Sequence, residues 1–327
     1  SVGTKQRPVH TEILVRPIHR GVNDIGSWRS ALRLADLGNR TKLYDLFTDL
    51  LIDGYLSDAI DKRIDAVTDA DLAFTIDGKQ VDEMDALMDT PEFESLLREI
   101  MLSRFWGVSL VECLFLDGFG FKSIPRKHIR TKTKEIAIRE EDEHGIPYAD
   151  NDLIIQFGSD DDFGILLRAA PFVIYKRGGF GDWAQFVELF GMPQRIGKYS
   201  SMDEQSRRAL IQAFEEAGSA PYLVIPKETE ATQTTLSSSG NGALYNDFRN
   251  ACNEEILITV LGQTMTTQDG SSLAQGQVHM AVQEKKHRAD RRFVERMLNK
   301  YFVPLLEKRG YPAGGGRFKF LDKAQEI

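Results

Sequence analysis

The stretch that decides the fold is GGFGDWAQFVELFGMPQRIGKY, residues 178–199. Four large apolar side chains within it recur at the i, i+3, i+4 and i+7 spacing of one helical stripe. They are Trp183, Phe186, Val187 and Phe190. A glycine-punctuated aromatic helix of this kind is most often a core helix between tight turns. The alternative reading is a hinge between two bodies of the protein.

Polar and helix-breaking residues mark the ends of this predicted helix. Asp182 is placed to cap its first turn, and Gln185 three residues later completes a capping box. Gly191 and Pro193 are predicted to stop the helix, because glycine accepts the left-handed conformation that ends helices and proline cannot continue them. Three glycines precede Asp182, so we expect a short helix that follows a loosened segment.

The composition is that of an ordinary globular protein. The chain has 327 residues, of which 42% are hydrophobic and 28% are charged. This length exceeds what a single core usually serves, so we expect two or more subdomains. The formal charge of −8 argues against a protein that grips nucleic acid over its whole surface, although it is compatible with a channel that holds DNA weakly.

Metal, redox and membrane functions have little support in the sequence. Cys113 and Cys252 are the only cysteines, and both lie in apolar patterns typical of buried thiols in a reducing compartment. The histidines show no metal-ligand spacing such as HExxH, and no GxxxxGK[ST] phosphate-binding loop occurs. No stretch approaches the roughly 20 apolar residues of a membrane span. We therefore expect no metal, no cofactor and no membrane contact.

Local patterns predict alternating helices and strands. Ser57 and Ser201 are expected to cap helices, and residues 72–78 read as a strand followed by a tight Asp-Gly turn. Residues 126–139 carry six cations among isoleucines, and we expect strands with either a solvated charged face or a subunit contact. The last long helix is expected to bend at Pro304.

Several motifs resemble the family of Mu-like phage portal proteins, and together they span about residues 40–310. The sharpest ones are DWAQF, FGMP and RIGKY within residues 182–199, and GSS with QVH within residues 270–279. FWGVSLVE at residues 105–112 and GILLR at residues 164–168 are also similar to passages of that family.

The resemblance implies an α+β phage portal fold divided into an arm, a wing, two stem helices around a small α/β clip, a tunnel loop and a long helix. The implied bounds are 1–40 for the arm, 41–170 for the first part of the wing, 171–191 for stem helix 1, 192–236 for the clip, 237–263 for stem helix 2, 264–276 for the tunnel loop, and 277–327 for the long helix with a C-terminal wing or crown remnant. The sequence departs from the family by stopping soon after its last helix, which leaves a large crown unpredicted.

The same resemblance implies a ring, usually of twelve copies, at one vertex of a phage capsid. Double-stranded DNA would pass through the ring during packaging and ejection. The terminase large subunit would dock on the clip, and head-tail adaptor and major capsid proteins would be the other partners. The chain would assemble in the host bacterial cytoplasm and end in the virion. The resemblance implies no catalytic residue, so we expect a structural protein and not an enzyme.

Two sets of residues are the candidate functional positions. The predicted tunnel loop is rich in hydroxyl and amide groups, which suit brief contact with a phosphate backbone. A Ser-Gly loop between helices is otherwise only a linker, and this alternative stays open. The predicted channel-lining residues are Thr264, Met265, Thr266, Thr267, Gln268, Asp269, Ser271 and Ser272. The predicted subunit-interface residues of the stem are Trp183, Phe186, Phe190 and Phe248.

Two other functions stay open at this stage. One is a carboxylate-dependent nuclease, although such metal sites draw their oxygen ligands from separate elements. Its residues would be Asp160, Asp161, Asp162 and Glu112. For Glu112 we expect a salt bridge or a solvated position in preference to catalysis. The other is a non-phage oligomeric scaffold in which the loop at Met265 binds a protein.

Overall fold

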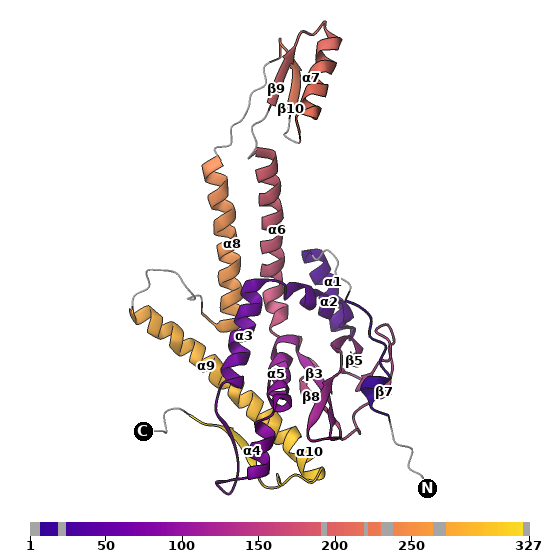
Figure 1. Cartoon of the computed structure of the whole chain (residues 1–327), viewed down its shortest axis with the longest axis vertical. Coiled ribbons are helices and arrows are strands. Elements are labelled where there is room, and N and C mark those ends of the chain that lie inside the picture. The colour runs from indigo at the N-terminus through magenta and orange to yellow at the C-terminus, as the bar shows by residue number, and fades with distance from the viewer. Residues whose placement is uncertain are drawn as a thin grey trace. The chain divides into compact units, whose positions relative to one another are not determined.

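The structure, a computed structural model, describes residues 7–18, 24–190, 195–218, 222–229, 238–263 and 273–322. The chain splits into two units, of which unit 1 is Ser1–Ile174 with Glu254–Ile327 and unit 2 is Tyr175–Asn253. The boundary passes through helices α6 (Leu166–Phe190) and α8 (Ser238–Leu261) (Figure 1). Both units combine helices and strands, which confirms the predicted α+β class.

Helix α5 (Pro91–Trp106) is the central helix of unit 1, and its ends follow from local sequence. Thr90 accepts a hydrogen bond from the Phe93 amide at 3.2 Å, and proline occupies the first turn, where its missing N–H is not needed. Gly107 ends the helix at φ 90°. A Cβ there would lie 2.1 Å from the Asp162 carbonyl oxygen, so no larger residue fits.

Two helices before α5 differ from the sequence-based expectation. Helix α3 (Gly54–Thr68) begins before Ser57, because Asp53 is its N-cap and accepts a hydrogen bond from the Leu56 amide at 3.0 Å. Helix α1 (Ile25–Asp36) lies within residues 1–40, which we predicted to be an arm. Its buried side consists of only two alanines, so its apolar stripe is too weak to stand out in the sequence.

The first sheet joins a strand from the N-terminal segment of unit 1 to a strand from its C-terminal segment. Strand β1 (Leu72–Ile76) pairs with β2 (Lys79–Gln80) and with β11 (Arg317–Phe320), both antiparallel. Asp77 and Gly78 adopt φ values of 51° and 77°, as a two-residue hairpin turn requires. The predicted strand and its Asp-Gly turn are therefore confirmed.

The second sheet has the order β4-β3-β8. Strand β3 (Val108–Leu114) lies in the middle and is buried over almost its whole length, and its neighbours are β4 (Gly120–Ser123) and β8 (Ile154–Gly158). A third, smaller sheet contains β5 (Ile129–Arg130), β6 (Glu135–Ile136) and β7 (Ile146–Pro147). The short helical elements of unit 1 are η1 (Val9–Thr11), α2 (Thr41–Leu50), α4 (Asp82–Met88) and η2 (Arg126–His128).

The last helical run of unit 1 is irregular one turn earlier than predicted. Helix α9 (Leu273–Met297) passes into a π-helical turn, η3 (Leu298–Phe302), and then into α10 (Val303–Lys308), which contains Pro304. Because proline donates no N–H and crowds the preceding turn, a wider turn before it accommodates the ring. The Asn299 side chain fixes this turn to β11 by two hydrogen bonds with the Phe318 backbone, of 2.7 and 2.9 Å.

Unit 2 contains the remaining parts of α6 and α8 and a small α/β module. In the module, β9 (Arg195–Tyr199) and β10 (Tyr222–Pro226) pair in parallel and are connected through α7 (Glu204–Glu216) (Figure 1). Asp203 caps α7 and accepts a hydrogen bond from the Ser206 amide at 3.0 Å. The prediction that Ser201 is the cap was wrong by two residues.

Two buried charges form an ion pair between α3 and α9. Arg63 donates to the two carboxylate oxygens of Asp290 at 2.9 and 2.6 Å and to the Val260 carbonyl oxygen of α8 at 3.0 Å. Arg104 of α5 places its Nε 3.4 Å from the same carboxylate. Side-chain exposure is 3% for Arg63 and 0% for Asp290. The Asp290 carboxylate thus connects α9 to α3 and α5, and Arg63 extends the connection to α8.

Removal of this carboxylate should destabilise the protein strongly, because it leaves a buried guanidinium without a counter-charge. We expect Asp290→Ala to lower the free energy of unfolding by about 3–5 kcal/mol, measured by urea denaturation. The matched control is Asp58→Ala, which breaks the exposed Asp58–Lys62 pair on the same helix as Arg63 and should cost less than about 1 kcal/mol. Equal losses for the two variants would contradict this assignment.

Candidate functional site

Helix α6 is continuous through the segment that we expected to be a hinge. It includes Gly178, Gly179 and Gly181, and Asp182 lies in its middle and does not cap it. Each glycine costs about 1 kcal/mol relative to alanine in a helix. The helix persists because it packs along α8, a long-range contact that the local pattern does not report. The prediction of an Asp182 cap was therefore wrong, and of the two readings of this stretch the continuous helix holds and the hinge does not.

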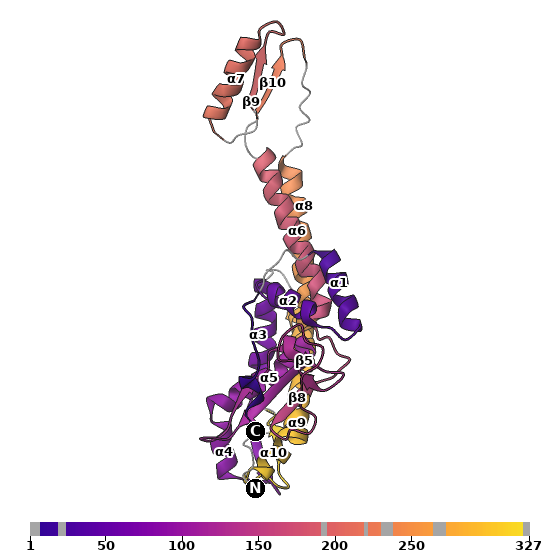
Figure 2. The same cartoon turned by 90° about the vertical axis from the view of Figure 1, so that its right-hand side faces the viewer.

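Aromatic side chains line the contact between α6 and α8 within unit 2. Trp183 stacks on Tyr245 with ring centroids 6.2 Å apart and an interplanar angle of 6°, and Phe186 lies 6.2 Å from the same tyrosine. Lys176 donates to Asn253 at 2.8 Å, and both side chains are buried. Residues later in α6 contact residues earlier in α8, so the two helices are antiparallel (Figures 1 and 2).

A close approach explains one of the three glycines of α6. A Cβ on Gly179 would lie 2.9 Å from the Phe248 ring of α8, whereas a Cβ on Gly178 or Gly181 would meet nothing within 4 Å. The structure thus brings three of the four predicted stem residues, Trp183, Phe186 and Phe248, onto this helix pair. Phe190 is the last residue of α6, and its side chain lies outside the description.

The same helix pair exposes large apolar side chains that the described residues of unit 2 leave uncovered. The exposed fraction is 51% for Val187, 66% for Leu244 and 43% for Phe248. Two helices alone cannot enclose the side chains on their outer faces. Exposed apolar side chains of this size are typical of surfaces that contact another protein.

The βαβ module of unit 2 is covered on one face only. Gly197 of β9 lies under Phe214 of α7, where a Cβ would come within 2.8 Å of the ring. On the opposite face, Ile196 and Leu223 are 38% and 48% exposed. Because a two-stranded sheet is marginally stable by itself, this face also requires a partner surface.

The predicted channel-lining residues lie outside the residues that the structure describes. They are Thr264, Met265, Thr266, Thr267, Gln268, Asp269, Ser271 and Ser272. The described residue that precedes them, Gln263, is buried and donates from Nε2 to Gln283 Oε1 of α9 at 3.0 Å. Before it, α8 ends where Gly262 adopts φ 75°.

The four carboxylates of the nuclease hypothesis are not brought together. Glu112 pairs with Ile154 across β3 and β8, and Val108 pairs with Gly158 at the other end of these strands. Glu112 and Asp160 are therefore separated by about six residues of extended chain, on the order of 20 Å. In the described part of the chain, no group of three or more histidine, cysteine or acidic residues is arranged to hold a metal ion. The geometry does not support a nuclease site.

Glu112 holds the N-terminal segment of its own chain. Its carboxylate accepts hydrogen bonds from the Val9 and His10 amides at 2.7 and 2.9 Å, and His10 Nδ1 lies 2.6 Å away. Glu112 is thus engaged with His10 and is not solvated, and this partner is 102 residues earlier in the sequence, where no pattern signals it. The adjacent Cys113 is buried, and burial followed by the Glu112 charge raises the pKa of its thiol to about 12. This thiol is therefore protonated near neutral pH.

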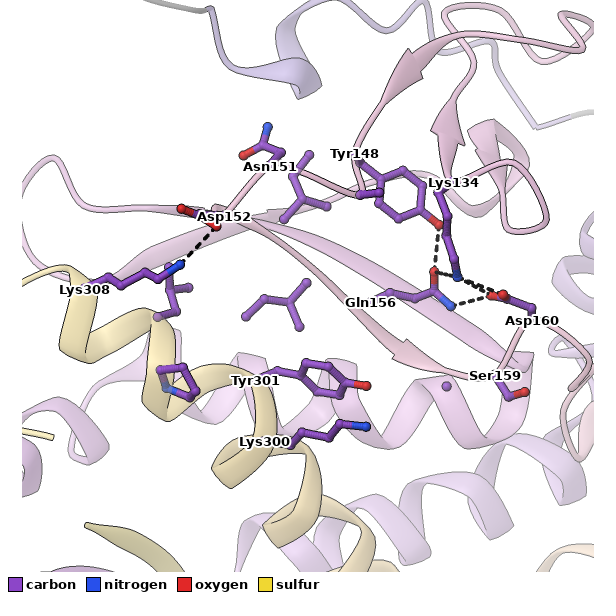
Figure 3. Close-up of a pocket in the computed structure, with 16 residues that line it drawn as sticks. Lys134, Tyr148, Asn151, Asp152, Gln156, Ser159, Asp160, Lys300, Tyr301 and Lys308 are labelled. Atoms are coloured by element: carbon purple, nitrogen blue, oxygen red, sulfur yellow. Dashed lines mark hydrogen bonds and ion pairs between the residues drawn. The ribbon is translucent and has the colours of Figure 1, made fainter. Parts of the chain in front are cut away.

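Asp160 belongs to a polar network at the edge of a pocket beside β8. Lys134 donates to both of its oxygens at 2.7 and 2.8 Å, and Gln156 donates at 2.8 Å while accepting from Tyr148 (Figure 3). Burial acts to raise the pKa of Asp160, but the hydrogen bonds from Lys134 and Gln156 outweigh it, so the pKa is lowered.

The pocket itself has a volume of 680 Å³ and lies between β8 and the helical run η3–α10 (Figure 3). Lys308 is paired with Asp152 at 3.2 Å, and Lys300 lies over the Tyr301 ring at 5.0 Å. The network of Asp160 and these two contacts engage most of the charged side chains at the rim. These charged side chains bind one another, and such an arrangement is typical of a structural network and not of a preformed ligand site.

The basic run at residues 126–139 is also structural. Arg126 donates to Glu99 at 3.0 Å and to the Val108 carbonyl at 2.9 Å, and it stacks over the Trp106 ring at 4.8 Å. Arg130 donates to several backbone carbonyls, including that of Asp142. The prediction of a solvated face was wrong for these two arginines, since they fix loops of the chain itself.

No described helix is long and apolar enough to cross a membrane.

With this geometry in place, the class of protein follows. An α+β chain in which a βαβ module is inserted between two long antiparallel helices has the phage portal fold that its motifs resembled. The chain belongs to the family described as portal protein of Mu bacteriophage, whose model matches residues 44–327.

Two curated relatives agree with this assignment. The portal protein of Escherichia phage Mu is 29% identical over 140 residues, which are 42% of this chain and 27% of that protein. The Mu-like prophage FluMu protein gp29 of Haemophilus influenzae is 29% identical over 124 residues, which are 37% of this chain and 24% of that protein. The matched segments thus span about a quarter of each relative.

One solved structure is similar to the chain in fold. A neck of an empty GTA particle, computed with C6 symmetry, gives a TM-score of 0.50 at 10% identity over 94% of this chain and 87% of that chain. An HK97 family phage portal protein from Corynebacterium diphtheriae gives a TM-score of 0.49 at 14% identity over 84% of this chain and 94% of that chain.

The glycines of α6 provide a test of the helix-pair contact. Gly178→Ala should stabilise the helix by up to about 1 kcal/mol, because it removes backbone entropy at a position with free space. Gly179→Ala should lose that gain, because its methyl group must displace the Phe248 ring. Hydrogen exchange of the α6 amides measures both. Equal protection in the two variants would show that the contact between Gly179 and Phe248 does not constrain the pair.

Proposed function

We propose that this chain is one subunit of a portal ring, usually of twelve copies, at a single vertex of a phage capsid. The observation that carries the proposal is the exposure of large apolar side chains on the α6/α8 pair, at Val187, Leu244 and Phe248, in a member of the portal family. Surfaces of this kind are completed by another copy when several chains surround a common axis. The proposal assigns no catalytic residue to the chain.

In this proposal the parts of the chain have separate tasks. The arm (1–40), the wing (41–170) and the long helix with the C-terminal wing or crown remnant (277–327) form the body of each subunit. The two stem helices (171–191 and 237–263) pack against neighbouring copies, and the clip (192–236) presents the docking surface. The tunnel loop (264–276) faces the channel. Charge supports this division, since a chain with a formal charge of −8 holds DNA weakly and lets it slide.

The proposed partners follow from the same division. Double-stranded DNA would pass through the ring, the terminase large subunit would dock on the clip during packaging, and head-tail adaptor proteins would later take its place. The major capsid protein would surround the ring in the virion, after assembly in the host cytoplasm. Polar side chains at the channel would touch phosphates through hydroxyl and amide groups, which position a duplex without reading its sequence.

The apolar face of the helix pair is tested by charge insertion. Val187→Glu together with Leu244→Glu should abolish rings in electron micrographs, because buried carboxylates without partners oppose association. The folded subunit should persist, since both positions are exposed within it. The matched control is Leu116→Glu, at a 94% exposed apolar residue outside this pair, which should leave the rings intact. Rings formed by the double variant would refute the proposed interface.

The channel assignment is tested by proximity to DNA. A photo-crosslinking amino acid at Gln268 should attach the subunit to DNA in filled particles, whereas the same group at Lys79, on an exposed hairpin, should not. Denaturing gels of nuclease-treated particles measure the attachment. Crosslinking at Lys79 without crosslinking at Gln268 would place the channel elsewhere on the chain.

A further inference from the structure

Another pocket of unit 1 is lined mainly by positive charge. Its volume is 580 Å³, and its lining includes four cations from four different helices and one carboxylate. The cations are Arg63 of α3, Arg104 of α5, Arg168 of α6 and Lys286 of α9, and the carboxylate is Asp162. All five residues belong to unit 1. We call this cavity the basic pocket.

Carboxylates balance two of the four positive charges. Asp290, buried behind the pocket, accepts two hydrogen bonds from Arg63 and lies 3.4 Å from the Nε of Arg104. One carboxylate balances only one of these two guanidinium groups, and Asp162 interacts electrostatically with Arg104. The Cζ of Arg104 lies 4.9 Å from the centroid of the Phe293 ring, which holds the guanidinium in place. In the described part of the chain, the two terminal nitrogens of Arg104 have no hydrogen-bond acceptor.

The charges of Arg168 and Lys286 pair with no described carboxylate. Arg168 is exposed and Lys286 is half-buried. The Lys286 side chain packs against the end of α8, where a Cβ on Gly262 would lie 2.6 Å from its Cε. Burial lowers the pKa of Lys286, and the three arginines of the basic pocket lower it further, whereas Asp290 acts to raise it. The subunit thus gathers like charges in one cavity and leaves two of them without a counter-charge among its described residues.

We propose that the basic pocket binds a terminal phosphate, either as the free ion or as a phosphate monoester. Arg104, Arg168 and Lys286 come from three helices, so they can donate to three oxygens of a tetrahedral anion, whereas a carboxylate has two oxygens in one plane. The hydroxyl groups of Ser159 and Thr259 line the same pocket and add further donors. This inference goes beyond the proposed ring and does not depend on it.

Charge distinguishes a terminal phosphate from the phosphate of a DNA backbone. A phosphate monoester carries a charge of about −1.5 to −2 at neutral pH, which matches the two uncompensated cations Arg168 and Lys286. A backbone phosphodiester carries a single negative charge and has only two unesterified oxygens. It therefore leaves one cation uncompensated and one of the three donor groups without an acceptor.

Thermal unfolding tests whether the site exists. Inorganic phosphate should raise the unfolding temperature of the wild-type protein by about 2 °C or more over sodium chloride of equal ionic strength, because a ligand of the native state stabilises it. A similar shift with glycerol phosphate identifies a terminal phosphate in general as the ligand, and no shift with it identifies the free ion. Acetate should act like chloride. Equal stabilisation by phosphate, acetate and chloride would overturn the inference.

A double variant tests where the phosphate binds. Arg168→Gln together with Lys286→Gln should lower the phosphate affinity at least about tenfold by isothermal titration calorimetry, because charge-assisted hydrogen bonds are lost. Without phosphate the variant should be at least as stable as wild type, since it removes repulsion between like charges. The matched control is Lys79→Gln with Arg296→Gln, which removes one lysine and one arginine at exposed positions outside the basic pocket. It should bind phosphate as wild type does.

The remaining outcomes separate this inference from its alternatives. If the double variant binds phosphate as tightly as the control, the site is elsewhere and the inference is overturned. If circular dichroism shows that the double variant is unfolded, Lys286→Gln alone takes its place and should still weaken binding. If wild type binds duplex DNA and not phosphate, and the variant loses DNA binding, the pocket contacts a phosphodiester and the inference is overturned. Mass photometry of the same samples reports rings, so rings without phosphate binding contradict this inference alone, and phosphate binding without rings contradicts the proposed function alone.

Discussion

The buried ion pair between Arg63 and Asp290 is the constraint on which the body of the subunit depends. It joins helices that are 227 residues apart in sequence, and Arg63 also reaches the α8 backbone at Val260. A buried charge pair of this kind is a poor source of stability in comparison with apolar packing, but it tolerates only one arrangement of its helices. It therefore fixes which faces of α3 and α9 point inward and which remain at the surface.

At its surface, the subunit exposes apolar side chains that its own described residues do not cover. The α6/α8 pair exposes Val187, Leu244 and Phe248, and the two-stranded sheet of the βαβ module leaves Ile196 and Leu223 uncovered. These are features that a second copy completes. By contrast, the polar groups that first suggested chemistry are engaged inside the chain, as Glu112 is with His10 and Asp160 is with Lys134. This contrast is what favours an assembly function over catalysis.

Local signals in the sequence predicted much of the fold and little of the candidate site. Thr90 and Pro91 marked the start of α5, and the Asp77-Gly78 turn marked the hairpin, because both depend on neighbouring residues only. The continuity of α6 through its glycines depends on α8, more than 50 residues away, and local propensity pointed to a break there. The partners of Asp290 and Glu112 depend on contacts over more than 100 residues, for which one sequence carries no pattern. The family motifs at residues 182–199 predicted features of the fold that local propensity did not predict.

The central claim is that separate copies complete one another, and the mass of the purified protein tests it most directly. Sedimentation equilibrium at low salt should give one large species whose mass is an integer multiple, near twelve, of the 36.9 kDa chain. A stable species of 36.9 kDa at high protein concentration, with Leu244 and Val187 still exposed to solvent by chemical labelling, would contradict the account.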